Sequence, residues 1–177
     1  MINEASPNNF VGSVSPEQLR SRVWISDCLK HIDRDINSCI VLGSWYGILP
    51  YVLKKYNNIP KIIANDIDKH CIEVSKKLNP TIKHIHGDCN QLHYKKPIDC
   101  VINPSVNNIV DRGWFERIPK GTLCLLQTEN IETEKGCPST LKEMLKLYPL
   151  STILEKKQLN CEDTNEKFIR SLVIGIK

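Results

Sequence analysis

A glycine-bearing turn between an apolar run and a helical pattern is the feature that most constrains this fold. The apolar run ends in Val41-Leu42, and the turn Gly43-Ser44-Trp45-Tyr46-Gly47 follows it. Acidic residues come after the next two apolar runs, at Asp66 and at Asp88. If these runs are neighbouring parallel strands, the turn and both acids meet at the carboxyl edge of a sheet, where open α/β sheets bind ligands. The spacing indicates a binding site for an adenosyl ligand.

The rest of the chain continues this alternation of strands and helices. We expect strands at 39–42, 61–65, 81–85, 99–102 and 121–127, and helices at 16–32, 46–57, 69–78 and 138–148, with a helical or irregular stretch at 109–118. Two further strand-like runs, 151–158 and 168–176, are joined by a polar loop that is too short for a crossover helix, so we expect them to be antiparallel. The sequence predicts an α/β fold, a Rossmann-like three-layer α/β/α sandwich whose seven-stranded, mostly parallel sheet ends in an antiparallel C-terminal hairpin.

Residues 1–14 differ from the rest in composition. They are rich in Asn, Ser and Pro, which predicts a flexible N-terminal arm. Ser15 and Pro16 are typical of the N-cap and first turn of a helix, and Asp68 is typical of the N-cap of a later one, with Asp66 as the alternative cap. The remainder, 15–177, is long enough to bury a core of its own and is predicted to be a single domain.

Composition excludes several classes of protein. No apolar run approaches the roughly 20 residues that span a bilayer, and the first residues lack the pattern of a secretory leader, so a cytoplasmic protein without membrane contact is expected. The net charge is +4, with lysine pairs scattered at the ends of elements, which is a weak footprint for nucleic acid. None of the eight cysteines forms a CxxC pair, so we expect reduced, buried thiols. His84 and His86 share one face of a strand without a clear third ligand, and no metal site is predicted.

The order of these motifs resembles the class I S-adenosylmethionine (SAM)-dependent methyltransferases over about residues 16–177. The segments 101–109 (VINPSVNNI) and 114–122 (WFERIPKGT) are similar to those of small methyltransferase-like proteins found in phage genomes. The resemblance implies SAM as the cofactor. A nicotinamide dinucleotide is the alternative cofactor, but this sequence lacks the second and third glycines of the GxGxxG fingerprint that binds it.

The resemblance also assigns roles to residues. Asp66 is expected to accept hydrogen bonds from the ribose hydroxyls, and Asp88 from the adenine amine, beside the backbone N–H of Cys89. Gly43 lets the backbone approach the amino-acid end of the ligand. The full predicted cofactor-binding set is Gly43, Ser44, Trp45, Tyr46, Gly47, Asp66, Ile67, Asp88, Cys89 and Asn103. The chain departs from the family pattern at Val41, which replaces an acid, and at Trp45, which replaces the middle glycine and is placed to wall the adenosyl pocket or to obstruct it.

Asn103-Pro104-Ser105-Val106 follows the fourth predicted strand and is the candidate catalytic motif. It is similar to the (Asn/Asp/Ser)-Pro-Pro-aromatic motif of amino-methyltransferases, in which the polar side chain and a proline carbonyl accept hydrogen bonds from the target amine. Asn103 and Pro104 would orient the acceptor. The aromatic residue on which a flipped base would stack is Val106 here, which weakens the case for a nucleic-acid substrate. An ordinary turn is the alternative interpretation.

The sequence therefore predicts a SAM-dependent methyltransferase that moves a methyl group to a nitrogen or oxygen acceptor. No recognition domain is evident, so the acceptor is expected to be small or to be brought by a partner protein, and a small molecule is slightly favoured over nucleic acid. The first predicted helix, with Trp24, is expected to close over the pocket. The alternatives are a nucleic-acid amino-methyltransferase, a SAM-consuming enzyme of other chemistry, and a non-catalytic SAM-binding domain that acts through a protein partner.

Overall fold

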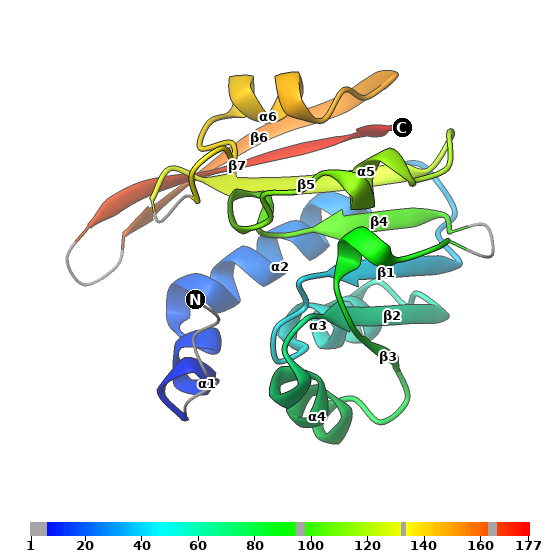
Figure 1. Ribbon diagram of the computed structural model, residues 1–177, viewed down its shortest axis with the longest axis vertical. Coiled ribbons are helices and arrows are strands. Elements are labelled where there is room, and N and C mark those ends of the chain that lie inside the picture. The colour runs from blue at the N-terminus through cyan, green and yellow to red at the C-terminus, as the bar shows by residue number, and fades with distance from the viewer. Residues whose placement is uncertain (1–6, 95–97, 132–133, 163–165) are drawn as a thin grey trace. The chain divides into compact units, whose positions relative to one another are not determined.

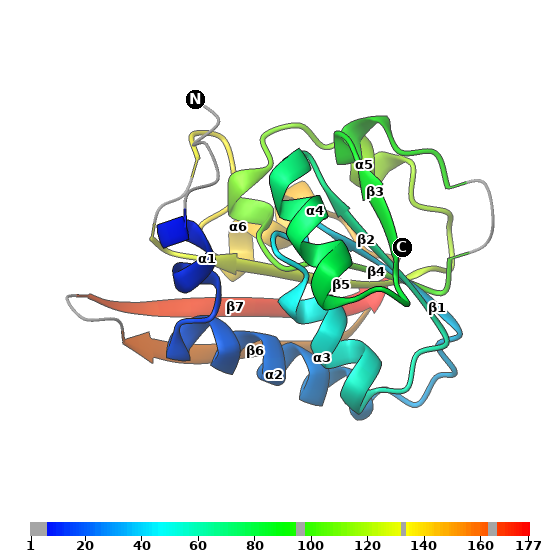
Figure 2. The same cartoon turned by 90° about the horizontal axis from the view of Figure 1, so that it is seen from below.

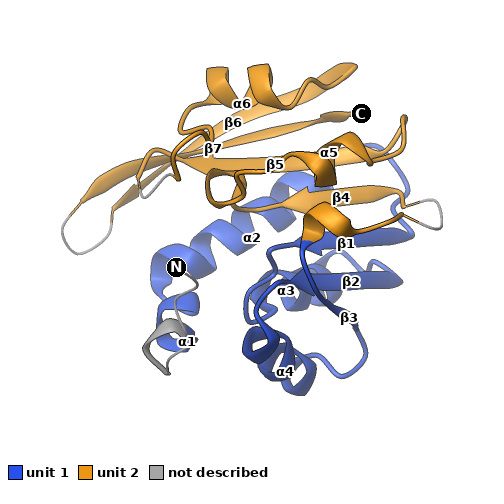
Figure 3. Cartoon of the chain, in the orientation of Figure 1, with its two compact units in different colours: residues 1–88 blue, residues 89–177 orange. Residues whose placement is uncertain are grey.

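The computed structural model describes residues 7–94, 98–131, 134–162 and 166–177. Contacts divide the chain into two compact units, Met1–Asp88 and Cys89–Lys177 (Figure 3). The described residues contain seven strands, three in the first unit and four in the second. We call Met1–Asp88 unit 1 and Cys89–Lys177 unit 2.

Unit 1 contains a parallel sheet in the order β3-β2-β1 (Figure 1). Its elements are α1 (Pro7–Ser13), α2 (Pro16–Lys30), β1 (Ser38–Leu42), α3 (Ile48–Tyr56), β2 (Lys61–Asp66), α4 (Lys69–Leu78) and β3 (Lys83–His86). Strand β1 is buried from Cys39 to Leu42, as a continuous apolar run predicts. Helix α2 packs on α3, and Ser26 and Asn57 tie the two helices together through two hydrogen bonds.

Local sequence explains where these helices begin. Ser15 caps α2 by accepting a hydrogen bond from the backbone N–H of Gln18, and Pro16 occupies the first turn. The carboxylate of Asp68 caps α4 by accepting from the N–H groups of His70 and Cys71. Both predicted caps are confirmed.

Unit 2 contains a mixed sheet in the order β4-β5-β7-β6. Its elements are η1 (Cys89–Gln91), β4 (Cys100–Asn103), η2 (Val106–Asn108), α5 (Gly113–Glu116), β5 (Leu123–Glu129), α6 (Leu141–Leu147), β6 (Thr152–Glu162) and β7 (Lys167–Ile176). Strands β4 and β5 are parallel, and β7 is antiparallel to both β5 and β6. The long β6–β7 hairpin stands out in two views (Figures 1 and 2). The predicted C-terminal antiparallel pair is confirmed.

Two expectations need correction in detail. The predicted N-terminal arm contains helix α1, which its composition did not indicate, while residues 1–6 lie outside the described residues. The stretch 109–118, expected to be helical or irregular, contains the single helical turn α5. The hairpin strands are longer than predicted, since β6 continues to Glu162.

Seven of the eight cysteines are buried, as the sequence predicts, and Cys137 is half-buried. In the described part of the chain, no helix is both long enough and apolar enough to cross a membrane.

Candidate functional site

The turn between β1 and α3 has an unusual backbone. Gly43, Trp45 and Gly47 have positive φ angles of 57°, 52° and 80°. A left-handed conformation costs about 1 to 2 kcal/mol for a residue with a Cβ, so Trp45 has a backbone conformation that glycine adopts more readily. Such strain persists only where surrounding contacts hold it.

Asp66, the last residue of β2, provides those contacts. Its Oδ2 accepts a hydrogen bond of 2.6 Å from the backbone N–H of Trp45, and its Oδ1 accepts one of 2.9 Å from Asp68. The N–H of Ser44 also donates to the carbonyl of Asn65, at 2.8 Å. Burial raises the pKa of Asp66 above its ordinary value, while the backbone donors act in the opposite direction. The predicted cofactor acid thus braces the glycine turn directly.

Gly47 is required by close packing. A Cβ there would collide with Ser75 Oγ and lie 2.9 Å from Asn79 Nδ2. Asn79 Nδ2 donates to the Gly47 carbonyl at 3.0 Å, so the end of α4 holds the start of α3. Gly43 differs, because a Cβ built there meets no atom within 4 Å. The space above Gly43 lets a ligand approach the backbone.

An aromatic cluster lies on the same turn. Tyr46 is fully buried, and its ring centroid lies 5.2 Å from that of Phe10 in α1 and 5.5 Å from that of Trp45. Burial is the largest cause that raises the pKa of Tyr46 to about 12. The position of a Cβ on Gly12 is 3.9 Å from the Trp45 ring, so α1 packs against Trp45 as well. The sequence prediction did not include this contact of α1 with the turn.

The turn after β3 is fixed from β2. Asn65 Nδ2 donates to the carbonyl oxygens of Ile85 and Gly87, at 3.2 and 2.9 Å, and the N–H of Gly87 donates to the carbonyl of Asp66. Asp88 follows directly after Gly87, which is bonded to both Asn65 and Asp66. Asp88 is half-buried and ends unit 1, whereas Cys89 is buried and begins unit 2.

The other predicted residues divide between the two units. Unit 1 brings the glycine turn and Asp66 together, while the side chain of Ile67 is exposed. The histidines have structural partners, since His84 Nε2 lies 2.9 Å from Ser75 Oγ and His86 Nε2 lies 3.1 Å from the carbonyl of Ile67. Among the described residues, no group of three or more His, Cys, Asp or Glu side chains could hold a metal ion.

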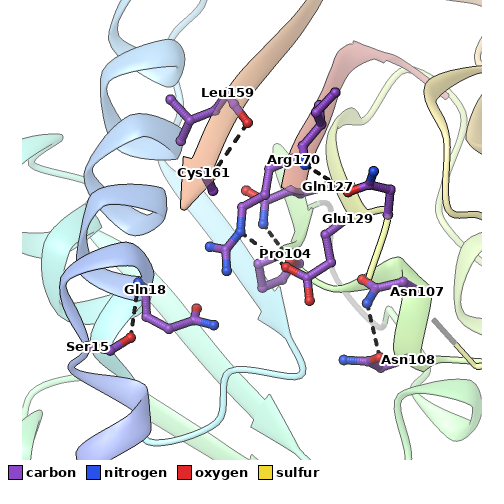
Figure 4. Close-up of polar contacts among 12 residues, drawn as sticks. Ser15, Gln18, Pro104, Asn107, Asn108, Gln127, Glu129, Leu159, Cys161 and Arg170 are labelled. Carbon is purple, nitrogen blue, oxygen red and sulfur yellow. Dashed lines mark hydrogen bonds and ion pairs between the residues drawn. The ribbon is translucent and has the colours of Figure 1, made fainter. Parts of the chain in front are cut away.

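The candidate catalytic motif lies in unit 2 at the end of β4. Asn103 is fully buried, and its Oδ1 accepts a hydrogen bond of 3.0 Å from the N–H of Ser105. The carbonyl of Pro104 accepts from Gln127 Nε2, also at 3.0 Å (Figure 4). Both oxygens expected to receive a target amine are therefore already bonded within the chain. Each retains a second lone pair, and Asn103 Nδ2 is a buried donor with no partner among the described residues.

Sequence reasoning missed Gln127, Glu129 and Arg170, which gather near this motif (Figure 4). Arg170 interrupts the apolar run of β7, and that interruption was the available signal. Its Nε lies 3.2 Å from Oε2 of Glu129, and Arg170 is only 2% exposed. A nearly buried guanidinium in a strand requires a compensating charge, which Glu129 supplies.

The sequence matches no protein family model and no curated protein. Solved structures do match. The N-methyltransferase NodS from Bradyrhizobium japonicum, solved with S-adenosyl-L-homocysteine, has a TM-score of 0.70 at 11% identity, with 97% of this chain and 93% of that chain covered.

Two further structures cover almost the whole chain. A putative methyltransferase in complex with the Trm112 activator of Haloferax volcanii has a TM-score of 0.72 at 12% identity, with 96% and 94% covered. A S-adenosylmethionine-dependent methyltransferase from Clostridium acetobutylicum has a TM-score of 0.65 at 10% identity, with 94% of each chain covered. The predicted fold is confirmed: the chain has the Rossmann-like fold of the SAM-dependent methyltransferases.

Proposed function

We propose that this chain binds SAM and transfers its methyl group to a nitrogen or oxygen acceptor. The observation that carries the proposal is the left-handed glycine turn, braced by Asp66 at the carboxyl end of β2. A plain strand-to-helix turn has no need of a buried carboxylate to hold a tryptophan in a glycine conformation. The similarity to methyltransferase-like proteins of phages stays a prediction.

The residues of unit 1 fit the cofactor. Open space at Gly43 admits the amino-acid end of SAM, and Ser44 Oγ is a buried polar atom with no partner among the described residues. Such an atom is satisfied when a ligand or a water bonds to it. Asp66 uses one lone pair on each carboxylate oxygen for the backbone, and the remaining ones can accept from ribose hydroxyls. The adenine contacts of Asp88 and Cys89 remain part of the proposal.

When bound, SAM supplies an electrophilic sulfonium methyl group, and its transfer leaves S-adenosylhomocysteine. The contribution of this chain is to hold the nucleophile in line with the methyl carbon and the sulfur, and to exclude water. This alignment can supply most of the rate enhancement of methyl transfer. A lone pair of the acceptor would form the new bond to carbon while the carbon–sulfur bond breaks with its electrons on sulfur, and the proton of the acceptor would leave to solvent. Asn103 and Pro104 would orient the acceptor.

A small-molecule acceptor is favoured, because the motif at Asn103 offers no aromatic platform for a flipped base. Val106 is fully buried where such an aromatic would stand. A protein partner is the alternative, supported by the activator-bound structure with the same fold. In that case SAM would bind without turnover until the partner is added.

The test is release of S-adenosylhomocysteine from SAM across panels of amines, phenols, carboxylic acids, tRNA and peptides. Asn103→Ala should lower turnover at least tenfold, since it removes an orienting hydrogen bond. Lys142→Ala, at an exposed position of α6, is the control and should be close to wild type. Formation of another SAM product, such as methylthioadenosine, would contradict methyl transfer.

A further inference from the structure

Arg170 is the most unusual side chain of unit 2. It pairs in register with Glu129 of β5, and directly opposed residues of antiparallel strands have their side chains on the same face. Gln127 shares that face, two residues before Glu129. These three polar residues therefore form one cluster at the end of β5, which we call the β5–β7 polar cluster (Figure 4).

Glu129 compensates the charge of Arg170, but two of the three guanidinium nitrogens have no hydrogen-bond partner among the described residues. The 3.2 Å approach of Nε to Glu129 Oε2 is an ion pair, and neither Nε nor Nη1 has a hydrogen-bond partner with good geometry among the described residues. The guanidinium carbon lies 5.3 Å from the Phe168 ring centroid, which satisfies no donor. A buried charged donor without a partner is unfavourable, and such atoms in native proteins usually have a function or an unseen partner.

The position of the cluster connects it to the acceptor motif. Gln127 donates to the carbonyl of Pro104, so the cluster and the motif are parts of one bonded structure within unit 2. The side chain of Glu129 is 18% exposed, whereas Nη1 of Arg170 is itself buried. A group that reached the cluster past Glu129 would meet Arg170 Nη1 in the bonded structure that includes the carbonyl of Pro104.

We propose that Arg170 is a specificity residue that binds the methyl acceptor through Nη1 and selects an uncharged polar oxygen, such as a hydroxyl or an amide carbonyl. This inference rests on the proposed function. Because Glu129 already balances the guanidinium, a carboxylate or phosphate at Nη1 would add a second negative charge beside Glu129. A neutral oxygen gains the hydrogen bond without that repulsion.

The charge argument can be tested without knowing the acceptor. Glu129→Gln should expose an uncompensated guanidinium, so acetate and inorganic phosphate should bind it saturably and raise its melting temperature. Wild type and the double variant Glu129→Gln/Arg170→Met should show no such site at the same ionic strength. Glu155→Gln is the matched control, because it removes the carboxylate of the partly exposed pair with Lys157 on the same hairpin and should create no saturable site.

Two results would overturn the inference. If folded Glu129→Gln binds neither anion, Arg170 is sealed from ligands; if wild type binds them equally well, Glu129 does not exclude anions. Glu129→Ala serves as a second variant if Glu129→Gln does not fold.

The cofactor provides a separate comparison. Arg170→Met should retain the wild-type affinity for S-adenosylhomocysteine within about twofold, and a tenfold loss in folded protein would reassign Arg170 to the cofactor. If wild type does not bind S-adenosylhomocysteine, the proposed function fails, while the anion titration still decides whether Arg170 can be reached.

Discussion

The backbone N–H of Trp45 donates to Oδ2 of Asp66 at 2.6 Å, which joins the glycine turn after β1 to the end of β2. The same carboxylate receives the N–H of Asp68. The residue expected to bind the ribose thus also sets the shape of the turn that would bind the rest of the ligand. Replacing Asp66 should therefore lower the affinity for the ligand in two ways: the contact with the ribose is lost, and the glycine turn relaxes.

Asp66→Asn should therefore weaken binding of S-adenosylhomocysteine by roughly 10- to 100-fold, since charge-assisted hydrogen bonds contribute about 1.5 to 3 kcal/mol. Titration calorimetry measures this directly. Asp68→Asn is the control, because Asn is also a good N-cap and Asp68 has no predicted ligand role. Equal affinities for the two variants would argue against the role of Asp66.

Two glycines of the turn should respond differently to alanine. Gly47→Ala should lower stability by roughly 3 kcal/mol, or about 6 to 12 °C in melting temperature, because a left-handed residue is combined with a collision at Ser75. The new methyl group of Gly43→Ala would contact no other atom, so this variant should lose only the roughly 1 to 2 kcal/mol that a left-handed residue with a Cβ costs. Gly43→Ala should nevertheless weaken ligand binding, because its methyl group occupies the space at the turn. Thermal melts with and without S-adenosylhomocysteine separate the loss of stability from the loss of binding. A larger loss of stability in Gly43→Ala than in Gly47→Ala would contradict the account.

His84 should make the fold sensitive to acid. Burial lowers the pKa of His84 below 6.5, so the unfolded chain binds this proton more tightly than the folded chain. The contribution of His84 to stability is present above pH 6.5 and is lost as the pH falls from there toward the folded pKa. Urea melts of His84→Gln should show a smaller loss of stability in this range than wild type. The exposed His93→Gln is the control, and a wild-type slope in His84→Gln would refute the prediction.

Helix α1 should slow release of the cofactor. Phe10 meets the ring of Tyr46 edge to face, and such pairs contribute about 0.5 to 1.5 kcal/mol beyond burial. Phe10→Ala should therefore speed dissociation of S-adenosylhomocysteine by roughly 2- to 12-fold in stopped-flow measurements. Val11→Ala, on the same helix but 66% exposed, should leave the rate unchanged. Identical rates in the two variants would show that α1 does not gate release.

Local patterns predicted most of the fold, because caps and apolar runs act over a few residues. The caps at Ser15 and Asp68, the strands that carry the glycine turn and Asp66, and the C-terminal hairpin all follow from such patterns. What the sequence did not reveal depends on contacts between distant segments. The packing of Phe10 on Tyr46 gives α1 its place, and only the pairing of β5 with β7 brings Arg170 to Glu129.

The central claim is that unit 1 binds SAM, and a thermal melt with four samples tests it most directly. The protein alone is compared with the protein plus SAM, S-adenosylhomocysteine or NAD. A ligand at 100 times its dissociation constant adds about 2.7 kcal/mol, which is a shift of roughly 5 to 11 °C for a chain of this size. The account predicts this shift with the two adenosyl-sulfur ligands and none with NAD. If neither SAM nor S-adenosylhomocysteine raises the melting temperature, or if NAD alone raises it, unit 1 does not bind SAM as proposed.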